Sequence, residues 1–311
     1  MTRACWLVGA GLAVVGTGVV LGRLARRPGA PTDPDGLAPV GPGARRRLDA
    51  DVERLGLLER DGDARPPVRE ADLADLPAPV QRWMCRNGVV GAPPVQALRV
   101  PMSGRFRTGP GRGWMPFEAW QVDTVEPIAR IFRMRVAAGG VVPMFGVDSY
   151  VGGRGRMLGK LVGIWTVAAG EGHEFDLGEL ATWVNDVALL APSMLLGPHA
   201  SWHEVDDHHA DVVVTDGANV VSARLTFDDH DRVADFTTHD RWYAGTGPPT
   251  RTTWRTPVSA WTTTPDGHPV PGETTAVWEL PGGPFAYVEA DFDPIALELD
   301  PGTPAAQPTG P

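Results

Sequence analysis

One long helical stretch interrupts a chain whose hydrophobic period is otherwise two, and this combination constrains the fold most. From Asp176 to Leu196 the sequence reads DLGELATWVNDVALLAPSMLL, with apolar residues at spacings of three and four: Leu177, Leu180, Val184, Val187 and Ala191. Such spacing places an apolar stripe along one face of a helix. Proline cannot continue a helix, so Pro192 predicts that the regular helix ends near Leu190 or Ala191.

Beyond Pro94 apolar and polar residues alternate, which is typical of half-buried strands. The clearest alternations lie in 221–227, 274–280 and 286–292, and turn signals such as Asp216-Gly217 separate strand-like segments at hairpin distances. Pairing is therefore expected to be mostly antiparallel. We predict a mainly β fold of roughly ten strands. They would form one large twisted antiparallel sheet or half-open barrel, with the helix inserted after about the sixth strand and lying across the concave face.

The N-terminus predicts a membrane anchor. Residues 4–22 are uncharged and apolar or small, with Arg3 before them and Arg23, Arg26 and Arg27 after them, which fits a single membrane span. A cleaved signal peptide is the competing interpretation, but no clean A-x-A site follows. The arginines after the span favour a cytoplasmic domain by a small margin, so the side of the membrane stays open.

The rest of the chain divides by composition. After the anchor (1–27), a Pro/Gly-rich linker (28–75) contains a short amphipathic helix with Leu48, Val52 and Leu55 at helical spacing. Its cluster 45–47 of arginines either touches anionic headgroups or forms a solvated helix face. The β-rich soluble domain (76–297) opens with a second short helix, which begins at Pro77 and carries Val80, Trp83 and Met84. Residues 298–311 are expected to be a disordered tail.

Composition narrows the classes of function. The 42% hydrophobic content and 11 tryptophans can supply one dominant core, and the net charge of -10 without a basic patch argues against binding nucleic acid. Two distant cysteines, Cys5 and Cys85, cannot form a disulfide framework. The chain has no G-x-S-x-G, C-x-x-C or Walker sequence, so nucleophile and nucleotide enzymes are disfavoured and no cofactor is expected.

Polar residues on the long helix are the candidates for catalysis. Glu179 and Asp186 share one helix side about 10 Å apart, too far to share a proton without a ligand or metal between them. Glu179 could instead close a capping box with Asp176. The pair Asn185-Asp186 is either hydrogen-bonded to strand ends, with Asp240-Arg241 as a charge partner, or part of a polar site under the sheet.

Aromatic and methionine residues in the first half of the sheet are the candidates for ligand binding. They either fill the core or, in a half-open sheet, line an apolar cavity suited to a lipid. The predicted ligand-binding residues are Trp114, Phe117, Phe132, Met134 and Tyr150, together with Asn185 and Asp186 of the helix.

A histidine-rich segment, HEVDDHH from His203 to His209, contains metal-ligand types without a metal-binding spacing. Asp207 stands where a zincin would have its second histidine, and strand-like residues follow. We expect an exposed turn and no metal site.

Several segments between Leu76 and Ile295 resemble a bacterial family known only as a domain of unknown function: LPAPVQRW, GVVGAPPV, WMPFEAWQ, IARIFRMRV, DSYVGGRGRM, NDVALLAPSMLL and VSARLTFDD…VADFTTHDRW. The most specific part is Asn185-Asp186 followed by Ala191-Pro192-Ser193. The resemblance implies a β-rich fold after an N-terminal hydrophobic segment, similar in outline to periplasmic lipoprotein carriers, and no activity. The sequence departs from the family pattern around His203–His209, so the resemblance implies no site there.

Three hypotheses of function follow. The first is a non-enzymatic, membrane-tethered protein that binds an apolar ligand such as a lipid. The second is a hydrolase or isomerase-like enzyme with Glu179 and Asp186 or Asp240 as acid/base groups. The third is a membrane-tethered module that binds another protein through exposed aromatic residues. The absence of a catalytic motif favours the first.

Overall fold

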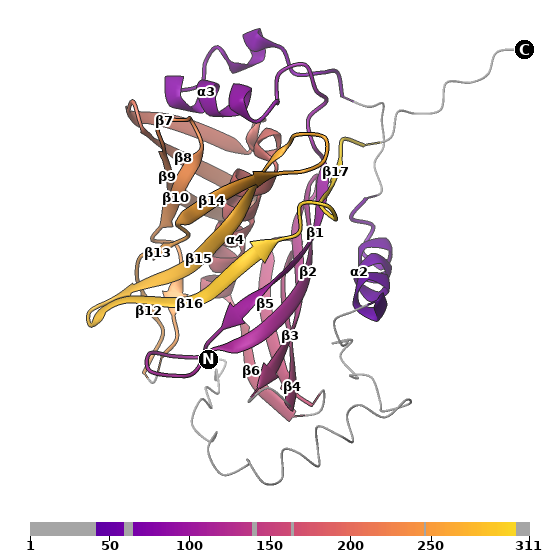
Figure 1. Ribbon diagram of the computed structural model, residues 1–311, viewed down its shortest axis with the longest axis vertical. Coiled ribbons are helices and arrows are strands. Elements are labelled where there is room, and N and C mark those ends of the chain that lie inside the picture. Colours follow the sequence, from indigo (N-terminus) through magenta and orange to yellow (C-terminus); the bar gives the residue numbers. More distant parts are fainter. Residues whose placement is uncertain (1–41, 59–64, 139–141, 163–164, 246, 303–311) are drawn as a thin grey trace, which may run out of the picture.

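A curled antiparallel sheet dominates the computed structural model, which describes residues 42–58, 65–138, 142–162, 165–245 and 247–302. Within these ranges 15 strands form one sheet, two more form a separate pair, and there are three α-helices (Figure 1). The predicted mainly β half-barrel is confirmed, although the predicted number of strands, roughly ten, is lower than the number observed. The excess comes largely from short strands between residues 242 and 263 and from the closing strand, which have little alternation to detect.

The sheet runs in the order β6-β5-β4-β3-β2-β1-β16-β15-β13-β10-β9-β8-β7, with β14 beside β15 and β17 beside β1. Neighbouring strands pair antiparallel throughout. The bounds are β1 Ala97–Phe106, β2 Met115–Val125, β3 Ile128–Ala138, β4 Val142–Val151, β5 Arg154–Leu161, β6 Trp165–Glu171, β7 Ala200–Asp206, β8 His209–Asp216, β9 Asn219–Phe227, β10 Val233–Thr238, β11 Trp242–Tyr243, β12 Thr250–Arg251, β13 Trp254–Arg255, β14 Val258–Thr263, β15 Pro269–Leu280, β16 Gly283–Phe292 and β17 Glu298–Asp300.

Helix α4 (His173–Leu190) connects the two edges of this sheet. It follows β6 and, through the short 3-10 helix η2 (Pro192–Leu195), precedes β7, and these two strands end the sheet on opposite sides. The helix therefore crosses the concave face and contacts β4 and β5 of one half and β9, β10 and β15 of the other (Figure 1). The predicted insertion after the sixth strand and the stop at Pro192 are both confirmed.

Burial on both sides explains why α4 lacks the one-sided pattern of a surface helix. Every residue from Asp176 to Leu190 is buried, so the stripe in the sequence is only part of the buried surface. The helix also approaches β5 closely, because a Cβ at Gly155 would lie 2.0 Å from the Phe175 carbonyl oxygen. Only glycine permits this approach.

The start of α4 differs from the prediction. The helix begins three residues before Asp176, after Gly172, and no side chain caps its first turn. The Asp176 carboxylate instead accepts a hydrogen bond of 2.7 Å from the Gly155 backbone N–H. The capping box of Asp176 and Glu179 is therefore wrong, and Glu179 is available for another partner.

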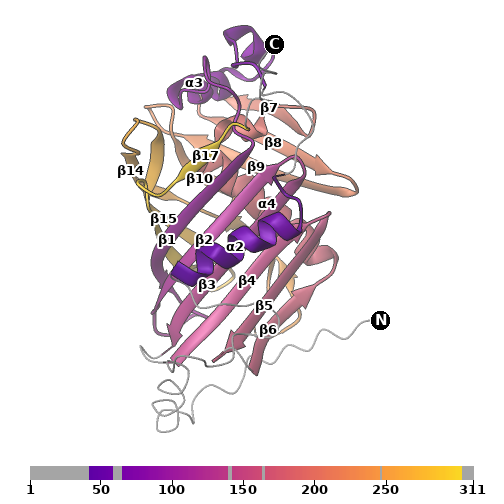
Figure 2. The ribbon, with the colours of Figure 1, turned by 90° about the vertical axis from the view of Figure 1, so that its right-hand side faces the viewer.

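Two short helices pack on other parts of the half-barrel. Helix α2 (Pro42–Arg54) lies on the convex face of β2 and β3, where Leu48 and Val52 are buried against Val122 and Ile131 (Figure 2). Leu55 is 37% exposed because the helix has already ended. Helix α3 (Ala78–Arg86) covers β7 and β8 near the 3-10 helix η1 (Glu70–Leu73), and it buries Val80, Trp83 and Met84 as predicted.

The predicted membrane span, residues 4–22, lies outside the described residues. Among the helices that are described, none combines the length and the apolar character needed to cross a membrane. The proposed tail, from residue 298, is described only to residue 302, and its first three residues form β17 beside β1.

Candidate functional site

A buried guanidinium, that of Arg130 on β3, organises the polar interior of the half-barrel. Its neighbours Ala129 and Ile131 pack against α2 on the convex face, so strand alternation directs Arg130 and Phe132 to the concave face. There the Arg130 Nε lies 2.8 Å from Asp186 Oδ2 and its Nη1 lies 2.9 Å from Glu179 Oε2. The two carboxylates that the sequence placed on one helix side are therefore bridged by a single arginine.

Strand β2 contributes an amide and a third carboxylate. The Gln121 side-chain amide donates to Asp186 Oδ2 at 2.7 Å and also to Asp123 Oδ2. Asp123 is fully buried opposite Arg130 in the strand register, and its Oδ1 has no hydrogen-bond partner among the described residues. Gln121 thus holds two carboxylates side by side, an arrangement that needs at least one of them to be neutral or compensated.

The segment that is most similar to the family is tied into this network. Asn185 donates to Asp186 Oδ1 at 3.1 Å and accepts a hydrogen bond from the Thr256 hydroxyl, which follows β13. Ser193, in the Ala191-Pro192-Ser193 stop, accepts a 2.9 Å hydrogen bond from the Val95 backbone N–H. Asn185 and Ser193 therefore join α4 and η2 to the segments that follow β13 and precede β1.

A second group of polar residues, Asp148, Arg241 and Tyr287, lies beside the first. The Arg241 guanidinium lies 4.2 Å from the Trp254 ring centre and 5.5 Å from that of Trp278. The Tyr287 hydroxyl accepts a hydrogen bond of 3.2 Å from Trp254 Nε1. A β-bulge between Ala276 and Val277 shifts the register here, so Tyr287 and Val288 both reach the concave side.

Burial changes the protonation of the acidic groups. Burial, reinforced by the charge of Asp148, raises the pKa of Glu179 to about 7. Burial also raises the pKa of Asp123 well above its ordinary value, and that of Asp148 to a lesser extent against the opposing charges of Arg130 and Arg241. Burial alone would lower the pKa of Arg130, but the charges of Asp186 and Glu179 outweigh it and raise that pKa. The Glu179 carboxyl can therefore exchange a proton near neutral pH.

An apolar patch adjoins the polar network on the concave face. Phe117 is buried, whereas Phe132 and Met134 are only partly buried. The Phe132 ring lies 5.1 Å from the Arg130 guanidinium, which places the patch next to the charges. We call this set the concave patch; its other members are Met102, Phe106, Met115, Ala119, Val136, Met144, Val288 and Ala290.

The remaining predicted site residues lie elsewhere. Tyr150 is fully buried, donates to Asp216 Oδ2 at 2.6 Å and accepts from Asn219 at 3.0 Å, so it is fixed in the core. Trp114 precedes β2 and stacks with Arg107 at 4.4 Å. Asp240 pairs with Arg251 and accepts from the Ser222 N–H at 2.7 Å. The expected pairing of Asp240-Arg241 with Asn185-Asp186 is wrong, because Asp186 pairs with Arg130.

Five polar residues of the site were not selected from the sequence: Gln121, Asp123, Arg130, Asp148 and Tyr287. Two of them left a signal. Arg130 lies on the same face of β3 as Phe132, and Asp123 lies on the same face of β2 as Gln121. The other residues on these faces are mostly apolar. A charged residue on the buried parity of a strand indicates a partner in the interior.

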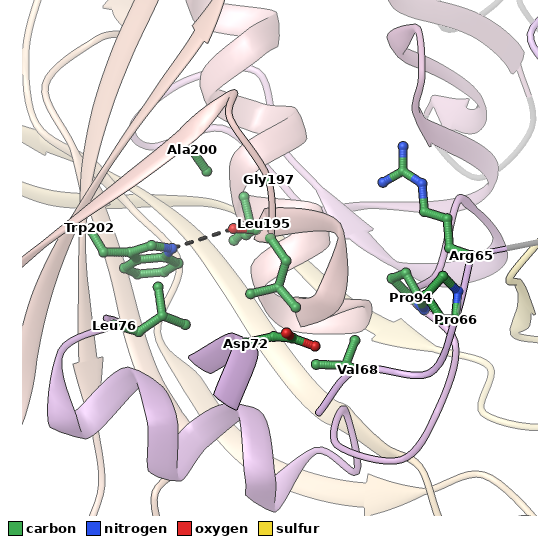
Figure 3. Close-up of a pocket in the computed structure, with 11 residues that line it drawn as sticks. Arg65, Pro66, Val68, Asp72, Leu76, Pro94, Leu195, Gly197, Ala200 and Trp202 are labelled. Carbon is green, nitrogen blue, oxygen red and sulfur yellow. Dashed lines mark hydrogen bonds between the residues drawn. The ribbon is translucent and has the colours of Figure 1, made fainter. Parts of the chain in front are cut away.

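A second candidate is a pocket at the end of the half-barrel, between the segment before β1 and the η2–β7 connection (Figure 3). Its volume is about 380 Å³, and most of its lining is apolar, including Val68, Leu76, Leu196 and Trp202. Its charged groups have partners: Arg65 pairs with Glu126, and Asp72 accepts a hydrogen bond from Arg69. We call it the end pocket. It shares no residue with the polar network.

The histidine-rich segment forms the β7–β8 hairpin. His209 Nδ1 lies 2.7 Å from Asp206 Oδ1, and residues 203–208 are exposed, so the expected exposed turn is confirmed. In the part of the chain that the structure describes, no group of three or more potential ligand side chains could hold a metal ion.

Comparisons with known proteins identify a family and a distant structural likeness. Residues 66–290 match the "Family of unknown function (DUF6544)", and the chain therefore belongs to this family. Solved structures with a similar arrangement include a LolA superfamily protein from Nitrosomonas europaea (9% identity, TM-score 0.36, covering 71% of this chain and 93% of that one). Another is a DUF1329 family protein from Desulfovibrio piger (10% identity, TM-score 0.33, covering 72% and 92%). No curated protein matches.

Proposed function

We propose that this protein binds an apolar ligand on the concave face of its half-barrel. The observation that carries the proposal is the concave patch, in which phenylalanine and methionine side chains such as Phe132 and Met134 stay partly exposed beside a network of charges. Contiguous exposed apolar surface on a soluble domain marks a binding site more often than chance exposure. Methionine side chains adapt to ligands of irregular shape.

The polar network gives the ligand an orientation. An acyl chain or similar group would lie on the concave patch, and the polar end would face Arg130, Glu179 and Asp148. Sites for small molecules typically combine apolar walls with a few fixed polar groups. The hydrogen bonds of Arg130 to α4 hold this polar floor rigid.

Displacement of a fluorescent apolar probe tests the proposal. The full-length chain should bind aminoanthracene, release it on titration with decanoic acid or decanol, and yield lipid on organic extraction. Met134→Asp places a charge in the concave patch and should reduce affinity by tenfold or more, about 1.4 kcal/mol. Val220→Asp is the matched control, since Val220 is 50% exposed on β9, outside the patch. Equal binding by both variants, or no binding by the unaltered chain, would contradict the proposal.

An acid/base enzyme is the second candidate, and the pKa of Glu179 near 7 favours it. A carboxyl group with such a pKa can accept and return a proton at neutral pH. On this alternative Glu179→Gln would abolish turnover of a bound ester while leaving its binding intact. Unchanged turnover in that variant would exclude Glu179 as the base.

The binding protein is further proposed to be tethered by residues 4–22, with the β-rich domain at 76–297 carrying the site. The support is the uncharged apolar run between arginines. The full-length chain should sediment with membranes, and a chain without residues 1–27 should remain in the supernatant. Equal distribution of the two would count against the tether.

A further inference from the structure

Several strands end together at one end of the half-barrel, in the lower part of Figure 1. Because neighbouring strands are antiparallel, β1, β3 and β5 end where β2, β4 and β6 begin. The β15–β16 turn lies at the same end, since β1 ends opposite Val288 and β16 begins at Gly283, beyond that point. We call this end the tip surface; its described members are residues 105–114, 165 and 281–285.

Charge on the tip surface differs from charge on the rest of the chain. The whole chain has a net charge of -10, yet the residues of the tip surface include three arginines and no aspartate or glutamate. Arg107 and Arg112 make no ion pair with any described residue, and Arg112 is exposed. At the opposite end of β5, by contrast, Arg156 lies 3.7 Å from Glu171. The tip surface therefore presents positive charge that none of its own residues cancels.

Two tryptophans accompany these arginines. Trp165, the first residue of β6, is 51% exposed. Trp114 is only partly buried, and its ring centre lies 4.4 Å from the Arg107 guanidinium and 5.1 Å from that of Arg105. Tryptophan rings are enriched at membrane interfaces because they are apolar with one polar edge, and arginine attracts lipid phosphates. The combination fits the head-group layer of an anionic bilayer.

The spread of these residues favours a bilayer over a compact partner. Trp114 immediately precedes β2, whereas Trp165 begins β6, four strand spacings away in the sheet, which is about 19 Å. Residues that dominate a protein interface cluster near its centre in well-packed pockets. A small anion could contact only one part of such a surface. A planar bilayer can contact both tryptophans and the arginines at once.

We propose that the tip surface docks on an anionic lipid bilayer, with Arg107 and Arg112 at lipid phosphates and Trp165 among the head groups. Phe106 and Met115 belong to the concave patch and form the last pair of β1 and β2 before the tip surface. Docking would therefore bring the concave patch next to the bilayer. The inference goes beyond the proposed function and does not depend on it, because only the tip surface has to contact lipid.

Hydrogen exchange tests the proposal on the full-length chain. The chain is reconstituted with phosphatidylcholine vesicles that either contain or lack phosphatidylglycerol, so that the samples differ only in anionic charge. The backbone amides of residues 107–114 should exchange about tenfold more slowly with the anionic vesicles, and added salt should reverse this protection. The exposed β7–β8 turn, outside the tip surface, serves as the internal control and should exchange equally in both samples.

Two variants should weaken the protection. Arg112→Gln removes one positive charge and should reduce the protection about fivefold. Trp165→Ala should reduce it by a similar factor. Both side chains are exposed, so both variants should fold, which circular dichroism would verify. Arg156→Gln is the matched control, because it makes the same change of charge at the opposite end, where Arg156 is 69% exposed, and should leave the protection unchanged.

Several results would overturn the proposal. Equal exchange with the two kinds of vesicle would show that anionic lipid is not recognised. Equal effects of Arg112→Gln and Arg156→Gln would assign the protection to overall charge and not to the tip surface. Protection that appears without vesicles, as the protein concentration rises, would assign the surface to a second copy of the chain. Loss of aminoanthracene binding with the protection intact would contradict the proposed function and leave this inference standing.

Discussion

The end pocket and the concave-face site differ in whether their charged side chains already have partners. The end pocket has a defined volume of about 380 Å³, but its charged residues Arg65 and Asp72 already have partners. The concave face combines partly exposed apolar side chains with the charges of Asp148 and Arg241, whose side chains make no hydrogen bond or ion pair with the described residues. The proposed binding site therefore rests on these unsatisfied groups and not on pocket volume.

The difference follows from where each region lies in the fold. The end pocket is lined mostly by the chain before β1 and the η2–β7 connection, together with Ala200 and Trp202 at the start of the edge strand β7 (Figure 3). The polar network is built by strands of both halves together with α4, which connects the two sheet edges. Groups on such elements are held more accurately than groups on connections. The predictions below test this contrast from the largest expected effect to the smallest.

Arg130→Met should be the most destabilising change. It leaves Glu179 and Asp186 buried without their shared counter-charge, which should cost about 3–5 kcal/mol of unfolding free energy. Urea unfolding measures this value. Arg130→Lys keeps the charge but loses the forked geometry, so its unfolding free energy should lie between those of the unaltered chain and Arg130→Met. A loss below about 1 kcal/mol for Arg130→Met would show that the network behaves like a surface ion pair.

The stability of the protein should fall as the pH rises from about 4.5 to about 7. The pKa of Glu179 is raised from 4.5 to about 7 by folding, so in this window the folded state binds more protons than the unfolded one. Its contribution is fully present below pH 4.5 and is lost as the pH passes 7, by up to about 3 kcal/mol. Urea unfolding at several pH values should show this slope. Glu179→Gln should flatten it, and an unchanged slope would refute the assignment.

How much of this contrast could be predicted depends on the range of the interactions. The helix, its stop at Pro192 and its place after the sixth strand were predictable, because period and proline act locally. The partner of Glu179 was not, since Arg130 is 49 residues away in sequence and only the curled sheet brings it to α4. The sequence therefore suggested a local role for Glu179, in a capping box, where the structure has a long-range ion pair with Arg130.

The predicted ligand-binding residues also divide into those placed by a local pattern and those placed by long-range contacts. Phe117, Phe132 and Met134 meet in the concave patch because strand alternation places them on one face. Tyr150 shares that parity, but its hydroxyl bonds to Asp216 on a strand of the opposite half, which no local pattern reveals. Arg241 joins the site through a tryptophan stack that also depends on the curl of the sheet.

Truncation in the two regions should separate their roles in binding. Phe132→Ala removes a partly exposed ring from the concave patch and should weaken binding of an apolar probe about tenfold, or 1.4 kcal/mol. Leu196→Ala removes a similar area from the end pocket and should leave the affinity unchanged. Displacement of aminoanthracene measures both. The reverse result would move the binding site to the end pocket.

The smallest effect is expected at the charged rim of the end pocket. Arg65→Gln removes the ion pair with Glu126. The Arg65 side chain is 41% exposed and the Glu126 side chain is 57% exposed. Water already solvates both groups, so the change should cost less than about 1 kcal/mol of unfolding free energy and should not alter probe binding. The same chemistry, one arginine removed from a carboxylate, thus gives a small effect here and a large one at Arg130. Similar losses for the two variants in urea unfolding would mean that burial does not distinguish the end pocket from the polar network.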